Sequence, residues 1–194
     1  MEVHLEAYRQ LLGRIDAHSA QAQGAFAKDL SCAVGCSSCC HRRFSVFAIE
    51  AESIRHWLRA SRSVSEEGHP AVSAPETSPS LPVIHDAEPC GFLDQQGSCR
   101  IYPVRPVLCR THGLPVAVKD HLGELVGDCC PLNFEQGLSH LNSEQFLDLD
   151  SLNTMLAALN QLYLGSLSES GPVRIELAQL ASEVLVPAVE AESG

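Results

Sequence analysis

Cysteine is the residue type in this sequence with the clearest chemistry. The chain has nine cysteines, and four of them fall within the nine residues from Cys32 to Cys40. Cysteines separated by two or three residues in a Gly- and Ser-containing loop can turn their sulfurs toward one metal ion or cluster. The sequence therefore predicts an iron–sulfur cluster, 4Fe–4S in type, or zinc. The candidate ligands are Cys32, Cys36, Cys39, Cys40, Cys90, Cys99, Cys109, Cys129 and Cys130.

Disulfide bonding and simple core packing account for the cysteines less well than metal binding does. A closed disulfide framework needs an even number of cysteines, and nine is odd. A single cysteine is usually a small buried hydrophobe, but four within nine residues do not fit that role. Adjacent pairs such as Cys39 and Cys40 rarely aim both sulfurs at one ion. Each pair therefore indicates two sites, or one ligand beside a spectator.

Arginines are concentrated near the cysteines, and they supply the charge that such a site needs. A partly buried centre with four thiolates carries excess negative charge, which must be offset. Arginine can donate hydrogen bonds to sulfur and never loses its proton. We predict that Arg105 and Arg110 contact the cofactor; the alternative is that the arginines pair with surface Asp and Glu. The arginines near a cysteine are Arg42, Arg43, Arg100, Arg105 and Arg110.

Pro106 fits the first turn of a short helix, which would place Cys109 near the helix N-terminus. The positive end of the helix dipole would then lower the pKa of the Cys109 thiol and favour the thiolate. His41 and His112 lie beside candidate ligands. Either histidine could replace a cysteine as a ligand, but we expect both to be hydrogen-bonding neighbours of the site.

The elements that must position these residues are mostly helical. Periodic apolar residues predict about four helices, and alternation predicts a short strand at 43–47 and one hairpin at 114–127. The fold class is therefore mainly α with small α+β elements, in which irregular cysteine-rich loops are pinned by metal. The predicted helices cover residues 3–30, 49–60 and 150–164 and a last segment that begins at Pro172.

The chain divides into three predicted regions. Residues 1–31 form an N-terminal amphipathic helix, 32–133 the cysteine-cluster metal-binding domain, and 134–194 a C-terminal helical region. Residues 61–82 contain four prolines, which favour neither a helix nor a sheet. We interpret this Ser/Pro-rich segment as a flexible loop inside the second region, because the cysteines on its two sides need each other.

Charge and hydropathy exclude several classes of function. The formal net charge is −11, so the surface repels phosphate backbones, and we expect no nucleic-acid partner. No apolar run approaches the roughly 18–20 residues that a membrane span needs, and residues 1–30 do not resemble a signal peptide. We therefore expect no membrane association and a cytoplasmic location, where thiols stay reduced.

These motifs together resemble the YkgJ-type cysteine-cluster family, whose domain is described as zinc- or iron-chelating. The resemblance covers about residues 32–130 and includes Glu50, which opens the second predicted helix. It implies that one group of cysteines contains the strongest ligand candidates, followed by Cys32 and one of Cys129 and Cys130. The strongest candidates are Cys36, Cys39, Cys40, Cys90, Cys99 and Cys109. The motifs that carry the resemblance are Cys32-x3-Cys36-x2-Cys39-Cys40, Pro89-Cys90 with Phe92-Leu93, and Cys99-x-Ile101-Tyr102-x2-Arg105-Pro106-x2-Cys109-Arg110.

Three functional hypotheses follow. The first is an iron–sulfur protein with a redox or electron-transfer role and an unknown protein or redox partner. The second is a zinc-binding scaffold or interaction module. The third is an iron–sulfur-dependent, methylase-like enzyme, which keeps a catalytic role open because the family has a branch similar to flagellin lysine methylases. No Gly-rich phosphate loop and no nucleophile motif supports conventional catalysis.

Overall fold

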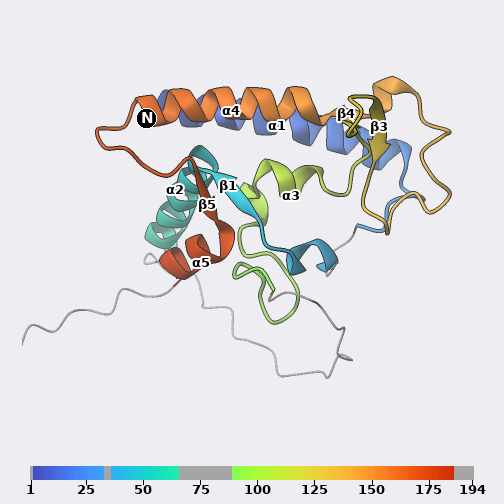
Figure 1. Cartoon of the computed structure of the whole chain (residues 1–194). Helices are drawn as coiled ribbons and strands as arrows, with labels where there is room; N and C mark the ends of the chain where they lie inside the picture. Colours follow the sequence, from blue (N-terminus) through green and yellow to red (C-terminus); the bar gives the residue numbers. More distant parts are fainter. Residues whose placement is uncertain (1, 33–35, 66–88, 186–194) are drawn as a thin grey trace, which may run out of the picture.

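The computed structural model describes residues 2–32, 36–65 and 89–185, and most of the regular structure in them is helical (Figure 1). Its small sheets contain strands of two to four residues. This architecture confirms the predicted fold class, mainly α with small β elements. The α-helices are α1 (Glu2–Ala25), α2 (Ala48–Ser65), α3 (Val107–Thr111), α4 (Leu149–Gly165) and α5 (Leu177–Leu185).

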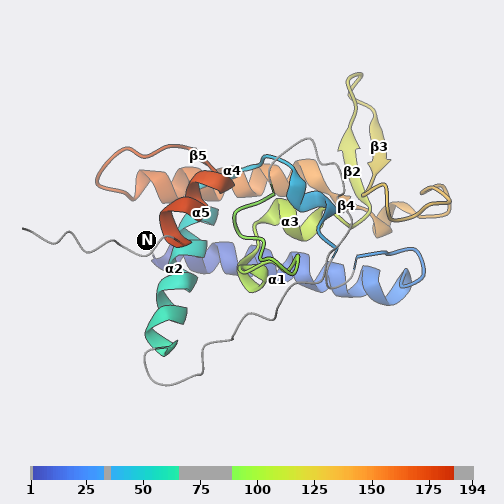
Figure 2. The ribbon, with the colours of Figure 1, turned by 90° about the horizontal axis from the view of Figure 1, so that it is seen from below.

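Helices α1 and α4 run alongside each other, and α3 packs against α1 (Figures 1 and 2). The predicted apolar stripe of the first helix is confirmed, because its residues are buried in the core that α1 shares with α2, α3 and α4. The helix ends at Ala25, five residues before its predicted end, directly after the poor helix former Gly24. The buried stripe consists of Leu5, Tyr8, Leu12 and Ile15.

The predicted hairpin is confirmed as β2 (Val116–Lys119) and β3 (Leu125–Asp128), which pair antiparallel. A third strand, β4 (Leu147–Asp148), joins β2 in parallel and was not predicted. The strand predicted at 43–47 is β1 (Ser45–Phe47). It pairs antiparallel with β5 (Arg174–Glu176), so a strand from the first third of the chain meets one from near its end.

The last helix was predicted to begin at Pro172, but it begins at Leu177. Residues 174–176 do not belong to the helix because they form the strand β5, which pairs with β1. In this pair Ile175 is buried opposite Val46. A three-residue strand gives too little alternation to be recognised in a sequence. The second helix extends to Ser65, because the first proline of the predicted loop 61–82 comes only at position 70. Residues 66–82 of that predicted loop lie outside the described residues.

A second apolar core lies on the side of α2 that faces α5. Phe92 and Ile101, from the segment between the cysteines, are buried there against Leu180 of α5. Cys90, Cys99 and Cys109 also pack against this core. The segments that carry Cys90, Cys99 and Cys109 are therefore held on one side by ordinary hydrophobic packing.

The three regions predicted from the sequence share one core. Ile15, Val107 and Leu156, one residue from each region, are all buried in the first core. The division into regions 1–31, 32–133 and 134–194 stays a prediction about chain organisation. None of the described helices combines the length and apolarity that crossing a bilayer requires.

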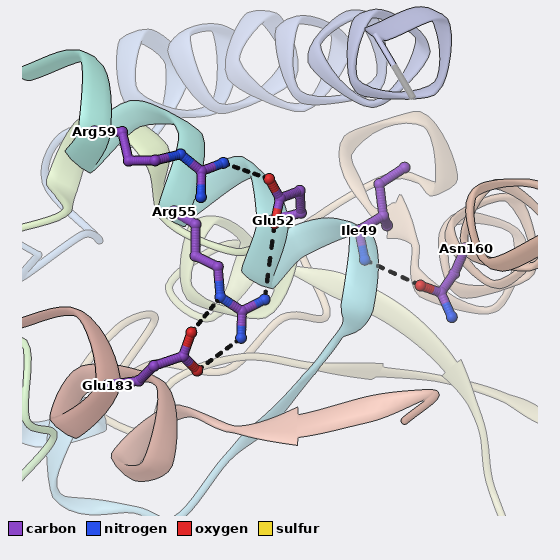
Figure 3. Close-up of polar contacts among 6 residues, drawn as sticks. All are labelled: Ile49, Glu52, Arg55, Arg59, Asn160 and Glu183. Carbon is purple, nitrogen blue, oxygen red and sulfur yellow. Dashed lines mark hydrogen bonds and ion pairs between the residues drawn. The ribbon is translucent and has the colours of Figure 1, made fainter. Parts of the chain in front are cut away.

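Asn160 in α4 is a buried polar side chain that fixes the start of α2. Its Oδ1 accepts the backbone N–H of Ile49 at 3.1 Å (Figure 3), and its Nδ2 donates to the carbonyl of Val173 at 3.3 Å. The side chain is fully buried, so the Ile49 N–H could not be satisfied by water in its absence, whereas the Val173 carbonyl would keep the N–H of Ala48 at 3.1 Å. On the outer side of α2, Arg55 forms an ion pair with Glu183 of α5 at 2.8 Å (Figure 3).

Replacing Asn160 with alanine leaves the Ile49 N–H and the Val173 carbonyl without these partners. We expect Asn160→Ala to lower the free energy of unfolding by about 1–3 kcal/mol, measured by urea denaturation. The matched control is Gln161→Ala, which removes an exposed amide from the same helix and should change stability by less than about 0.5 kcal/mol. Equal effects of the two substitutions would contradict the anchoring role of Asn160.

Candidate metal centre

Six cysteines from three segments of the chain line one cavity of about 280 Å³. The cavity lies between the 3-10 turn η1 (Ser38–His41), the segment that follows Pro89, and α3. Figure 2 shows η1 beside α3, although the two are far apart in the sequence. The cavity cysteines are Cys36, Cys39, Cys40, Cys90, Cys99 and Cys109.

Backbone hydrogen bonds join the first two of these segments. The N–H of Cys90 donates to the carbonyl of Cys40 at 2.7 Å, which brings the two clusters into direct contact. The N–H of Arg100 donates to the carbonyl of Phe92 at 2.8 Å and closes the short loop that carries Cys99. The cysteines are therefore brought together by main-chain pairing and not only by side-chain contacts.

Glu50 holds the third segment in place. This carboxylate is 3% exposed, and one of its oxygens accepts the N–H of Val107, in the first turn of α3, at 2.9 Å. Its other oxygen accepts the N–H of Phe47 at 2.8 Å, so Glu50 also caps its own helix in the manner of a capping box. The hydroxyl of Tyr8 donates to Glu50 at 3.5 Å. One buried carboxylate thus links α1, α2 and α3, and it sets the position of Cys109.

The sulfurs of Cys39 and Cys40 lie within hydrogen-bond reach of each other. The hydrogen bond with Cys40 lowers the pKa of the Cys39 thiol to about 6; burial opposes this shift, and the nearby His112 and Arg105 contribute to it. The same hydrogen bond raises the pKa of Cys40 well above its ordinary value. The pair therefore shares one proton, and both thiols face the same cavity.

The remaining cavity thiols that show a shift favour the protonated form. Burial raises the pKa of Cys90 and Cys99, while the N–H groups of Phe92 and Ile101 donate toward these sulfurs and act in the opposite direction. Burial also raises the pKa of Cys109 to about 12. The prediction that the helix dipole lowers this pKa is wrong. With only five residues, α3 has a weak dipole, and desolvation outweighs it.

The donor set fits a metal that prefers sulfur ligands. Six thiols around one cavity are soft donors, and backbone N–H groups already point toward two of them. Among the described residues, however, no three His, Cys, Asp or Glu side chains are close enough to hold a single ion together. The thiols are gathered around a shared space but do not converge on one point.

The two predicted cofactor-contacting arginines have different surroundings. Arg105 lines the cavity, and its guanidinium stacks on the ring of Tyr102 at 3.8 Å from the ring centroid. Arg110 is not among the lining residues. Its guanidinium forms an ion pair with Asp16 of α1 at 2.5 Å and donates to the carbonyl of Pro103 at 2.6 Å. Contact with the cofactor stays a prediction for both arginines, and the geometry supports it for Arg105.

The other three cysteines, Cys32, Cys129 and Cys130, contact the side chain or the backbone of Asn133 and are not among the cavity-lining residues. The amide of Asn133 donates to the sulfur of Cys32 at 3.3 Å, and the thiol of Cys129 donates to the Asn133 carbonyl at 3.7 Å. Gly113 permits this arrangement, because a Cβ there would lie 2.6 Å from the Cys32 sulfur. The assignment of these three cysteines as metal ligands stays a prediction.

Sequence reasoning did not identify Asn133, although it organises this second group of thiols. It donates to the Gly113 carbonyl at 2.7 Å and accepts the N–H of Ser31 at 2.9 Å. Its position three residues after Cys130 was the only indication in the sequence. Phe44 and Leu177, which form part of the cavity wall, were also missed, because an apolar residue in a sequence does not reveal which cavity it lines.

Comparison with known families agrees with this geometry. The family model CxxCxxCC, described as "Putative zinc- or iron-chelating domain", matches residues 31–130, about half of the chain. The matched range begins just before Cys32 and ends at Cys130, so it contains all nine cysteines. Searches of curated proteins and of solved structures found no match.

Glu50→Gln tests whether this carboxylate positions α3. The amide of glutamine cannot accept on both sides, so one backbone N–H should lose its partner. We expect the free energy of unfolding to fall by about 2 kcal/mol and the metal content per chain to fall with it. Glu52→Gln is the matched control, because Glu52 on the same helix makes ion pairs near the surface (Figure 3). Normal stability and metal content in Glu50→Gln would contradict the positioning role.

The raised thiol pKa values predict that metal uptake depends on pH. Burial keeps Cys90, Cys99 and Cys109 protonated at neutral pH, and a metal binds only the thiolates. The apparent affinity for Zn²⁺ should therefore rise with pH, by about tenfold per pH unit for each proton displaced. Competition with a chelator of known affinity between about pH 6.5 and 7.5 measures this dependence. A flat profile would show that the ligands are already ionised.

Proposed function

The chain belongs to the CxxCxxCC family of zinc- or iron-chelating domains, and from this membership we propose that its cavity cysteines bind an iron–sulfur cluster of the 4Fe–4S type with a redox role. One observation carries the proposal. Six thiols from three separate segments line a single cavity, yet no three of the described candidate ligands are placed around one ion. Four of these six thiols would be enough to ligate the cluster.

The spacing of the thiols is the argument for a cluster over a single zinc ion. Four sulfurs bound tetrahedrally to one zinc lie only about 3.8 Å apart, because each zinc–sulfur bond is near 2.3 Å. In a 4Fe–4S cluster each cysteine binds a different iron atom, so the sulfurs are farther apart. Apart from the adjacent pair Cys39 and Cys40, whose sulfurs are within hydrogen-bond reach, the thiols come from separate segments around the cavity, and this arrangement fits the cluster more closely.

The surroundings of the cavity suit a redox centre. The cluster would supply one-electron chemistry, with a potential set by hydrogen bonds to sulfur, net charge and exposure to solvent. The chain provides N–H donors at Phe92 and Ile101 and the cation of Arg105. Phe44, Phe92 and other apolar residues form much of the wall and limit the access of water.

We further propose that the protein works in the cytoplasm and exchanges electrons with a protein partner, without binding nucleic acid. All nine cysteines are free thiols, which suits a reducing compartment. The net charge of −11 argues against a nucleic-acid partner.

Purification under anaerobic conditions tests the proposal directly. We expect brown protein with a broad absorption band near about 400 nm, and iron and acid-labile sulfide in equal amounts at about four per chain. The band should bleach on reduction with dithionite. Colourless protein with stoichiometric zinc would instead establish the zinc-binding scaffold. Reduced protein that folds cooperatively with neither metal would contradict metal binding altogether.

Serine substitutions test which thiols are ligands. Cys109→Ser should lower the iron content to less than about a third of the wild-type value and reduce solubility, because a cavity ligand is lost from a buried site. The matched control is Cys129→Ser, which changes a cysteine of the group around Asn133 and should keep the iron and the absorption band. A well-folded Cys109→Ser protein with full iron content would remove Cys109 from the ligand set.

A further inference from the structure

The cysteine-bearing segments carry a positive charge that is unusual for this chain. Residues 36–44 and 89–112 supply the six thiols of the cavity, and they contain five arginines and a single acidic residue, Asp94. That carboxylate accepts the backbone N–H groups of Gln96 and Ser98, so it stabilises its own turn. The chain as a whole has a net charge of −11. Its charge is therefore strongly asymmetric, basic around the cavity and acidic over the remaining sequence.

Three of these arginines are available to a partner. Arg42, Arg43 and Arg100 are exposed, and within the part of the chain that the structure describes they form no ion pair. The other two arginines of these segments have contacts inside the protein, because Arg110 forms an ion pair with α1 and Arg105 lines the cavity. We call Arg42, Arg43 and Arg100 the arginine rim.

The arginine rim lies next to the cavity along the chain. Each of its members is flanked on both sides, at most three residues away, by residues that line the cavity. Figure 1 shows that η1 and the loop that follows Pro89 lie together on the side of α3 that is away from α1 and α4. The rim therefore belongs to the surface into which the cavity is set. The flanking residues that line the cavity are Cys40, Phe44, Cys99 and Ile101.

The cavity opens to solvent beside the arginine rim. Cys36 and Tyr102 line the cavity and are themselves exposed, and the exposed fraction of Tyr102 is 58%. Tyr102 comes two residues after Arg100, and its ring is held by the guanidinium of Arg105, 3.8 Å from the ring centroid. Tyrosine and arginine are enriched where proteins dock on one another, because both offer apolar area together with polar groups. The opening therefore has the composition of a protein-docking surface.

Charge decides which partner fits this surface. A nucleic acid would extend past the arginine rim onto the acidic remainder of the protein, which repels phosphates. A second copy in a closed two-fold dimer would bring its own arginine rim against the first, like charge against like. A globular protein with an acidic patch contacts only the opening. Because charges are screened beyond about 8 Å at physiological ionic strength, such a partner is attracted by the rim more than it is repelled by distant carboxylates.

We propose that the arginine rim and Tyr102 form the docking surface for an acidic protein that carries one electron, of the kind represented by a negatively charged ferredoxin. This inference rests on the proposed iron–sulfur function and names the partner of that site. One electron leaves the iron–sulfur centre of the carrier, which is oxidised, and enters the cluster in the cavity, which is reduced; no bond or proton changes place. Complexes of this kind are small and short-lived, and electrostatic attraction mainly speeds their formation.

A negatively charged plant-type 2Fe–2S ferredoxin is the probe, titrated calorimetrically into the full-length, metal-loaded protein. We expect saturable one-to-one binding that weakens on the order of tenfold between about 50 and 200 mM NaCl, because salt screens the rim. In stopped-flow experiments the reduced ferredoxin should bleach the cluster band at a rate that falls with salt in the same way. Binding that does not saturate or does not respond to salt would overturn the proposal. So would displacement of the ferredoxin by a single-stranded oligonucleotide, which would assign the surface to nucleic acid.

Charge variants locate the docking surface. Arg42→Gln, Arg43→Gln and Arg100→Gln should each weaken ferredoxin binding by about threefold, and the triple variant by more than about tenfold. Iron content and the absorption band should stay at the wild-type level, because all three side chains are exposed. The matched control is Lys119→Gln, which removes an exposed cation from β2, outside the cysteine-bearing segments, and should change the affinity by less than about twofold. A triple variant that binds as the control does would overturn the proposal.

This inference and the proposed function fail in different ways. Wild-type protein that contains zinc and no iron would refute the iron–sulfur function and the electron carrier with it. A protein that shows the iron band, but whose triple variant binds and accepts electrons from the ferredoxin at the wild-type rate, would refute only the docking surface.

Discussion

The position of the cysteine cavity depends on one buried carboxylate. Glu50 accepts the N–H of Val107 and the N–H of Phe47, and it receives the Tyr8 hydroxyl, so three helices meet at a single side chain. A helix as short as α3 has little stability of its own. It is held instead by this hydrogen bond and by the packing of Val107 in the first core. The geometry around Cys109 follows from both interactions.

Hydrophobic packing and metal chemistry have separate roles in this protein. Phe92, Ile101 and Leu180 form a core against which Cys90, Cys99 and Cys109 pack, so hydrophobic burial helps to place these three thiols. Burial then raises the pKa of thiols such as Cys109, and the protein holds protons where a cation would bind. Binding of a metal cation displaces those thiol protons, so the cation takes the place of the protons on the sulfurs. This exchange avoids the cost of several unpaired thiolates in a partly buried cavity.

The order of amino acids was enough to predict the thiol chemistry and most of the helices. Cysteine spacing indicates metal binding, and the stripe of Leu5, Tyr8 and Ile15 follows from the helical period. Which cysteines share a cavity became known only from the folded chain, because it depends on contacts such as that of Cys90 with Cys40. The same holds for the pairing of β5 with β1, since a three-residue strand gains its hydrogen bonds from a distant partner. Local periodicity carries no information about such long-range contacts, and burial, which sets the thiol pKa values, exists only after folding.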